Sequence, residues 1–228
     1  MKNNDEKTKK TKKTKKTPQK NHFYRFFRFL LRPLIKLVWP TEFLHKENFY
    51  KLDKNQRAIV CSNHLDTMDP NVICVEFFKD YFCALSKYEA FKNKFANWFL
   101  TKIEVIPVHR GEPDLHATRA VFKKLKENKK IVIFPEGTRN KTGDDKTMLP
   151  LKDGVAAFSL KTDTPIVPML YYRKLKPFKK NWLIVGEPFY LTDKFDHVPT
   201  VKEGTEYLAK VFEGLRTEID AYVEKKDA

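Results

Sequence analysis

Beyond residue 55 the chain alternates between short apolar runs and longer amphipathic stretches. The short runs are rich in Val and Ile and have the length of strands; they lie at 57–62, 81–85, 103–108, 130–134, 165–171 and 182–185. The longer stretches repeat apolar residues at helical spacing; they lie at 70–78, 88–102, 114–128, 154–161 and 201–225. This alternation predicts an α/β domain with a mostly parallel central sheet flanked by helices.

A different pattern precedes this domain, in the stretch HFYRFFRFLLRPLIKLVWP at residues 22–40. Its cations fall within an arc of about 80° on a helical wheel; they are Arg25, Arg28, Arg32 and Lys36. Phe and Leu cover much of the remaining surface. The charges argue against a membrane-spanning helix and favour a helix that lies on a membrane surface. Pro33 is expected to kink or split this helix. A helix packed on the domain core is the alternative.

The first twenty residues contain the repeat TKKTKKTKKT and offer little that could be buried, so we expect residues 1–20 to be disordered. Nine lysines against Asp5 and Glu6 give this tail +7 of the formal net charge of +16. We therefore divide the chain into a lysine-rich tail at 1–20, an amphipathic helical segment at 21–45 and an α/β domain at 46–228. The tail either solubilises the protein or binds it electrostatically to anionic lipid.

The positive charge implies an anionic partner, which could be nucleic acid, anionic lipid, or an acidic substrate or carrier protein. No nucleic-acid-binding motif is visible, so a basic nucleic-acid-binding protein is the weaker hypothesis. Three cysteines in apolar surroundings are expected to be reduced thiols of an intracellular protein; they are Cys61, Cys74 and Cys83. We see no Cys/His spacing typical of metal sites, and the N-terminus does not have the pattern of a signal peptide.

The stretch SNHLDTMDP at 62–70 directly follows a predicted strand. Asp69 as N-cap before Pro70 is a good helix start, which places His64 in a strand-to-helix turn. In such a turn a carboxylate can bond one imidazole nitrogen and leave the other free as a general base. Asp69 is the first candidate for this carboxylate, and Asp66 is also near. This spacing by itself is a weak signal.

Two further strand ends carry polar residues, and functional groups gather beyond the carboxyl ends of strands in such sheets. Arg110 ends one strand, and its planar fork of donors suits a phosphate. The stretch IVIFPEGTRN at 131–140 brings a carboxylate, a glycine, a hydroxyl and a guanidinium together; they belong to Glu136, Gly137, Thr138 and Arg139. Glu136 could receive a substrate hydroxyl or hold Arg139 or Arg110. Lys152 is a weaker candidate for an anion contact.

The chain has no GxSxG elbow, no Walker P-loop and no GxGxxG, which disfavours a serine hydrolase and gives nucleotide phosphates no obvious site. In their order, the motifs resemble those of the glycerolipid acyltransferases, in particular bacterial 1-acyl-sn-glycerol-3-phosphate acyltransferases. The NH-x4-D block is matched at Asn63, His64 and Asp69, and FPEGTR is matched without change at 134–139. A strand ending at Arg110 and the apolar strand at 166–169 complete the resemblance, which covers about residues 55–190.

The resemblance implies transfer of an acyl group from acyl-CoA or acyl carrier protein to the sn-2 hydroxyl of lysophosphatidate. His64 would be the general base, oriented by Asp69. Arg110, Glu136 and Arg139 would hold the glycerol phosphate, and an N–H near Gly137 could meet the oxyanion. No metal or redox cofactor is expected. Glycerol 3-phosphate or another lysolipid is the alternative acceptor. The protein would lie peripherally on the cytoplasmic face of the cell membrane.

Overall fold

The computed structural model describes residues 21–53, 55–109, 111 and 114–227. Its strands form one seven-stranded sheet in the order β1-β7-β6-β2-β5-β3-β4, and every neighbouring pair is parallel except β6 with β7. The strands are β1 (Thr41–Leu44), β2 (Ala58–Ser62), β3 (Phe82–Lys87), β4 (Ile106–Val108), β5 (Lys130–Ile133), β6 (Ile166–Tyr171) and β7 (Asn181–Val185). The predicted mostly parallel α/β sheet is confirmed.

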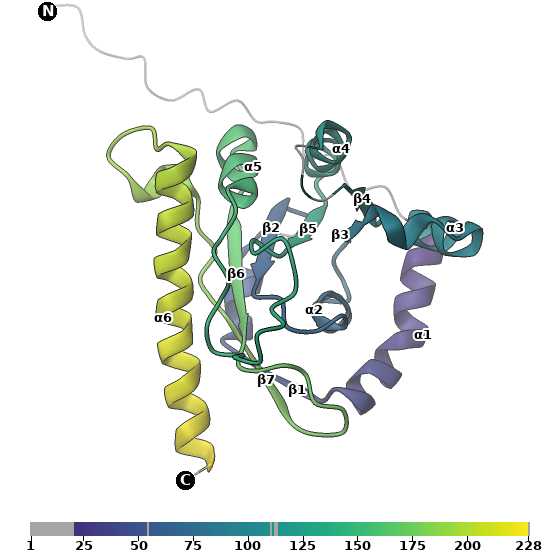
Figure 1. Ribbon diagram of the computed structural model, residues 1–228, viewed down its shortest axis with the longest axis horizontal. Helices are drawn as coiled ribbons and strands as arrows, with labels where there is room; N and C mark the ends of the chain where they lie inside the picture. Colours follow the sequence, from purple (N-terminus) through teal and green to yellow (C-terminus); the bar gives the residue numbers. More distant parts are fainter. Residues whose placement is uncertain (1–20, 54, 110, 112–113, 228) are drawn as a thin grey trace, which may run out of the picture.

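Helices cover both faces of this sheet (Figure 1). They are α1 (His22–Val38), α2 (Asp69–Glu76), α3 (Lys94–Lys102), α4 (Leu115–Lys126), α5 (Gly154–Thr162) and α6 (Val201–Asp227), with short 3-10 helices at Lys46–Lys51, Tyr88–Phe91 and Leu191–Lys194. Side chains alternate across the strands. In β2, Ile59 and Cys61 join the core beneath α4, α5 and α6, while Ala58 and Val60 join the core beneath α1 and α2. The three cysteines are free thiols.

The stretch 88–102, expected as one helix, is divided. A 3-10 turn at Tyr88–Phe91 comes first, and the side chain of Asn93 then caps α3 by accepting the N–H of Phe95 at 2.8 Å. The strand expected from residue 103 begins only at Ile106 because the backbone turns at Glu104, whose φ is 63°. The apolar periodicity that predicted one helix contains no information on the cap at Asn93 or the turn at Glu104.

Helix α1 runs without interruption through Pro33 and bends along its length (Figure 1). It ends at Val38, before Trp39 and Pro40. Strand β1 then follows at the edge of the sheet, paired with β7, which the sequence did not predict. The segment 21–45 thus contains one helix and one strand. The lysine-rich tail at 1–20, expected to be disordered, lies outside the described residues.

The inner side of α1 carries a buried cation. Arg28 is only 5% exposed, and its guanidinium donates to the backbone carbonyls of Cys74, Phe77 (3.1 Å) and Asp80 at the C-terminal end of α2. The exposed carbonyl ends and the negative end of the helix dipole favour a cation at the end of a helix. The expectation of a basic surface stripe is therefore wrong for Arg28, which fastens α1 to α2.

The outer side of α1 is rich in apolar residues. Its exposed large hydrophobic side chains are Phe26, Phe29, Leu30, Leu34 and Leu37, and Arg25 and Lys36 of the same helix are exposed as well. Phe95 and Trp98 of the adjoining α3 are exposed as well, and the ring of Phe23 packs against Trp98 at 5.6 Å between centroids. None of the helices within the described ranges combines the length and apolar character needed to cross a bilayer.

Candidate active site

The turn between β2 and α2 is fixed to the neighbouring strand β6 by one amide side chain. Asn63 is buried; its Nδ2 donates to the carbonyl of Tyr171 at 3.1 Å, and its Oδ1 accepts the N–H of Tyr171 at 2.8 Å. This pair of bonds imitates a strand ladder and holds the residue before His64 in place. The hydroxyl of Tyr171 also donates to the carbonyl of Asp69 at 2.7 Å.

His64 and Asp69 meet in this turn. The Nδ1 atom of His64 lies 3.0 Å from Oδ2 of Asp69, and the same oxygen accepts the N–H groups of Leu65 (2.8 Å) and Asp66 (2.7 Å). Asp69 is fully buried, and the His64 side chain is 13% exposed. Burial raises the pKa of Asp69, and the bond from His64 acts against that rise. With Nδ1 bonded to the carboxylate, Nε2 is the nitrogen free to accept a proton.

Asp66 has a different task in the turn. Its Oδ1 accepts the N–H of Met68 at 3.0 Å, which closes a local turn. The carboxylate bonded to the His64 ring belongs to Asp69. The expectation that Asp69 caps α2 is not met, because α2 begins at Asp69 itself and the carboxylate points back toward the turn.

The loop after β5 surrounds His64. Glu136 is buried; its Oε1 accepts the N–H of His64 at 2.8 Å and its Oε2 accepts the N–H of Leu149 at 3.0 Å. The carbonyl of His64 accepts the N–H of Asn140 at 2.7 Å. The ring of Phe134 stacks on the imidazole, with centroids 4.0 Å apart. Four contacts thus hold the histidine, and three of them come from the loop at 134–140.

Glu136 therefore differs from its expected role as a substrate ligand. Each carboxylate oxygen accepts a backbone N–H, and the side chain is buried. The hydrogen bonds described for this carboxylate do not include one from Arg139. Burial raises the pKa of Glu136, while the bonds from His64 and Leu149 lower it. The carboxylate positions the backbone of His64 and the loop that contains Leu149.

Gly137 and Lys152 lie against each other. The backbone of Gly137 has a φ of 70°, and a Cβ atom at this position would lie 2.9 Å from Cδ and Cε of Lys152. A glycine is needed both for this conformation and for the space that the lysine occupies. The N–H of Gly137 donates to the carbonyl of Phe134 at 2.9 Å, so the expectation that this group meets an oxyanion is not supported.

Two cavities meet at His64. The first, here called the α4–α5 cavity, has a volume of about 280 Å³ and is lined by Gly137, Lys152 and residues of α4 and α5. The second, the α1 cavity, has a volume of about 440 Å³ and extends beneath α1. Both are lined by His64, Leu85, Ser86, Lys87 and Phe134. The histidine is therefore accessible from two sides.

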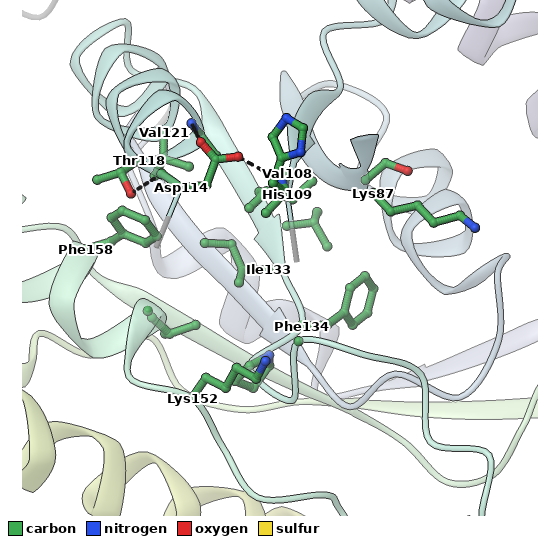
Figure 2. A pocket seen from close by; sticks show the side chains of 18 of the residues that line it. Lys87, Val108, His109, Asp114, Thr118, Val121, Ile133, Phe134, Lys152 and Phe158 are labelled. Atoms are coloured by element: carbon green, nitrogen blue, oxygen red, sulfur yellow. Dashed lines mark hydrogen bonds between the residues drawn. The ribbon is translucent and has the colours of Figure 1, made fainter. Parts of the chain in front are cut away.

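The remaining predicted residues divide between these cavities. Thr138 and Arg139 line the α1 cavity, and Nη1 of Arg139 donates to Oγ1 of Thr67 at 2.6 Å. Lys152 reaches the α4–α5 cavity; Figure 2 shows it with Phe134 on one side of that cavity and His109 on the other. Arg110 lies outside the described residues.

Three further residues near the base were not predicted from the sequence. Asn140 directly follows FPEGTR and shares the same turn, but its contribution is a backbone N–H, which leaves no trace in the sequence. Phe134 reads as the end of a buried strand, and its stacking on His64 depends on the neighbouring strand. Lys87 lines both cavities at the end of β3, and the polar end of that strand was an available signal.

Comparisons with known proteins show the family of the chain. Residues 41–172 match the Acyltransferase family. The 1-acyl-sn-glycerol-3-phosphate acyltransferase of Bacillus subtilis (strain 168) is 30% identical over 202 residues, which cover 86% of this chain and 95% of that protein. The enzyme of the same name from Borreliella burgdorferi is 35% identical over 132 residues, 57% of this chain and 51% of that protein.

A solved structure shares the fold. The crystal structure of the 1-acyl-sn-glycerophosphate acyltransferase from Thermotoga maritima superposes with a TM-score of 0.66 and 22% sequence identity, covering 88% of this chain and 80% of that one. The family match extends from β1 to the residue after β6 and includes the turn at His64 and the loop that surrounds it. The chain belongs to the acyltransferase family.

Proposed function

We propose that this protein transfers a fatty acyl group from an acyl thioester to the sn-2 hydroxyl of 1-acyl-sn-glycerol 3-phosphate, which yields phosphatidate for phospholipid synthesis. The observation that carries the proposal is the His64–Asp69 pair, in which Nδ1 is bonded to the carboxylate and the histidine lines both cavities. Such a base, accessible from two sides, suits a reaction between two large substrates. The names of the bacterial relatives support the choice of acceptor.

In the proposed reaction, Nε2 of His64 accepts the proton of the acceptor hydroxyl as its oxygen attacks the thioester carbonyl. Asp69 stabilises the imidazolium that forms and keeps the ring oriented. The tetrahedral intermediate then collapses, the carbon–sulfur bond breaks, and the thiolate takes the proton from the imidazolium. The new ester bond replaces the thioester without an acyl-enzyme. The step needs no metal or redox cofactor, and we propose none.

Cations around the base are proposed to bind the substrate phosphates. Arg139 and Lys87 border the cavities next to His64, and we assign the lysophosphatidate phosphate to Arg139 with help from Arg110. Lys152 is proposed as a second anion contact from the α4–α5 side. The positive net charge of the chain suits either donor, acyl-CoA or an acidic acyl carrier protein.

The proposed acceptor is a membrane lipid, and α1 offers a surface for it. Its exposed outer face of Phe and Leu side chains adjoins the exposed Phe95 and Trp98 of α3. Aromatic and aliphatic residues of this kind insert at the boundary of headgroups and acyl chains. We propose that the protein binds peripherally to the cytoplasmic face of an anionic membrane through this surface.

Leu37→Asp should weaken binding to anionic vesicles without changing thermal stability. Unchanged vesicle binding would refute the proposal that this surface binds the membrane.

A donor and acceptor panel tests the activity. Purified protein is expected to acylate lysophosphatidate from an acyl thioester in preference to glycerol 3-phosphate and lysophosphatidylglycerol, and His64→Ala should lower kcat/KM by at least about 10³-fold. His197→Ala is the matched control, because His197 lies near the start of α6 and bonds Glu203. Full activity of His64→Ala would refute the assigned base, and a preference for another acceptor would refute the proposed substrate.

A further inference from the structure

The loop between β6 and β7, residues 172–180, is basic and carries an exposed aromatic ring. Its sequence YRKLKPFKK contains five cations and no carboxylate, and Phe178 is 72% exposed. We propose that this β6–β7 loop is a second membrane contact, in which Phe178 inserts at the boundary of headgroups and acyl chains and exposed lysines bind the phosphates of anionic lipid. The inference rests on the proposed function and adds to its membrane surface a segment that lies far from α1 in the sequence.

The backbone of the loop disfavours a bulky side chain where the ring stands. Phe178 has a φ of 55°, in the left-handed region that bulky residues rarely adopt. Pro177 precedes it, and the N–H of Lys179 donates to the carbonyl of Lys176 at 3.4 Å, so Phe178 is the third residue of a β-turn. With positive φ this position usually takes Gly or Asn. An exposed phenylalanine there adds little to the core, so a contact outside the chain explains it better.

The turn is held in one conformation by Asn181, the first residue of β7. Asn181 is 1% exposed; its Nδ2 donates to the carbonyls of Lys179 (2.8 Å) and Lys176 (3.1 Å), and its Oδ1 accepts the N–H of Lys176 at 2.8 Å. Leu175 is buried beside the turn. These contacts fix the backbone that carries the ring before a membrane is met, so little conformational entropy is lost on binding.

The turn lies against the C-terminal end of α1 (Figure 1). The N–H of Phe178 donates to the carbonyl of Val38 at 2.6 Å, and the N–H of Asn181 donates to the carbonyl of Pro40 at 2.9 Å. Leu37, the residue before Val38, is 68% exposed. The exposed apolar row of α1 therefore ends beside Phe178, and the loop extends the proposed membrane surface beyond the helix.

Two lysines that flank the ring are available for an anion. Lys180 is paired with Glu42 at 2.6 Å, but among the described residues no ion pair or side-chain hydrogen bond engages the amino groups of Lys176 and Lys179. Both side chains are exposed. An acidic protein surface would account for the lysines but not for the exposed ring between them. An anionic bilayer offers phosphates and hydrocarbon together, so it is the partner that fits both.

Strand β6 connects the loop to the site. Tyr171, the last residue of β6, exchanges two hydrogen bonds with Asn63, the residue before His64. The β6–β7 loop and the His64 turn therefore leave the sheet at the same edge. A membrane contact at Phe178 turns this edge toward the headgroups, where the proposed acceptor carries its phosphate and its free hydroxyl.

Phe178→Gly separates membrane binding from folding, because it removes the ring and relieves the strained backbone. On vesicles of equal parts phosphatidylcholine and phosphatidylglycerol, we expect the partition coefficient of the full chain to fall about tenfold in a sedimentation assay. The Tm should equal or exceed that of wild type. Val198→Gly is the matched control: Val198 is 89% exposed and precedes α6, which lies on the other face of the sheet from α1. Unchanged vesicle binding in Phe178→Gly would overturn the proposal.

The two lysines give a second test that does not alter the turn. Lys176→Gln with Lys179→Gln should lower partition onto the same vesicles by about 10- to 30-fold, and added salt should shrink the difference. Lys202→Gln with Lys210→Gln removes the same charge from exposed positions of α6 and should bind like wild type. A raised KM for acyl carrier protein thioesters with unchanged vesicle binding would assign the loop to the carrier and overturn the proposal. Wild-type protein that binds vesicles but acylates no lysophosphatidate would instead refute the proposed function.

Discussion

The loops after β2 and β5 each place one buried carboxylate beside His64, but the two carboxylates bind different parts of it. Asp69 lies 3.0 Å from the ring nitrogen Nδ1, whereas Glu136 accepts the backbone N–H at 2.8 Å. Burial raises the pKa of both groups, and backbone N–H bonds partly offset that rise in both. Their environments are alike, so the part of the histidine that each one contacts decides what it does.

The role of Glu136 changes how the polar loop at 134–140 is interpreted. The loop at 134–140 brings several polar side chains together directly after a buried strand, and a substrate site is the natural hypothesis for it. In the structure, its carboxylate and the N–H of Asn140 hold the backbone of His64 on both sides. Of the residues of this loop, Phe134, Thr138 and Arg139 line the α1 cavity. A polar motif can therefore serve mainly as the support of a catalytic residue that lies elsewhere in the chain.

The largest effect is expected at the ring-bonded carboxylate. Asp69→Asn keeps the size of the side chain but presents an amide to Nδ1, which favours the wrong tautomer of His64. We expect kcat/KM to fall by about 10²- to 10⁴-fold with a far smaller change in KM. Steady-state kinetics with a folded variant, verified by circular dichroism, provides the measurement. Activity within about threefold of wild type would show that Asp69 does not orient the base.

A smaller effect on catalysis is expected at Glu136. In Glu136→Gln the new amide must point toward the N–H of either His64 or Leu149, which leaves a buried donor without an acceptor. This should cost about 1–3 kcal/mol of unfolding free energy and lower kcat by about 10-fold, because His64 is held less firmly. KM for lysophosphatidate should change little. A large rise in KM with normal kcat would show instead that Glu136 touches the substrate.

The pH dependence of stability adds an independent control for Glu136. Its folded-state pKa is raised by burial, so the folded protein binds the proton more tightly than the unfolded chain. Wild-type stability should therefore fall as pH rises from the ordinary glutamate range through the raised pKa. Glu136→Gln lacks this component, so the stability difference between the two proteins should be largest in acid and smaller at pH 7. Urea unfolding at several pH values measures it.

Much of the fold follows from local pattern. Strands β2, β5 and β6 are buried runs of Val and Ile bounded by polar residues, and their positions agree with prediction to within one residue. Strand β1 is a four-residue edge strand with a glutamate, and only its pairing with β7, far away in the chain, makes it a strand. Long-range pairing of this kind has no signal in a short sequence window.

The site was predictable to the same limit. The Asp-Pro helix start placed His64 in a turn with Asp69 as the first candidate for its carboxylate partner, while Asp66 stayed open. The direction of Glu136 depends on two loops that meet only after folding, so no local signal gave it. Arg28 was unpredictable for the same reason. Periodicity placed it on one side of α1, but the carbonyls that it binds lie at the end of α2.

Two glycines of the segment after β5 test whether Lys152 takes part in the reaction. Gly137 and Gly143 both have positive φ, of 70° and 89°, but only at Gly137 would a Cβ meet another side chain. Alanine at either position should cost about 1 kcal/mol from backbone strain. Gly137→Ala should also displace Lys152 and lower kcat/KM by about fivefold, if Lys152 contributes about 1 kcal/mol as an anion contact. Gly143→Ala should keep full activity. Equal activity in both variants would show that Lys152 does not contribute to the reaction.

The smallest effect is expected at Asp66. This carboxylate lies near His64 in the loop after β2 but does not bond its ring. Asp66 lies three residues before Asp69 in the same turn, yet its carboxylate accepts the N–H of Met68. Asn in this position keeps an oxygen for that bond, so Asp66→Asn should leave kcat/KM within about twofold and cost less than about 0.5 kcal/mol of stability. Measured beside Asp69→Asn, it makes the same chemical change at two neighbouring carboxylates. A comparable loss of activity in both variants would mean that the negative charge of the turn matters more than the bond to Nδ1.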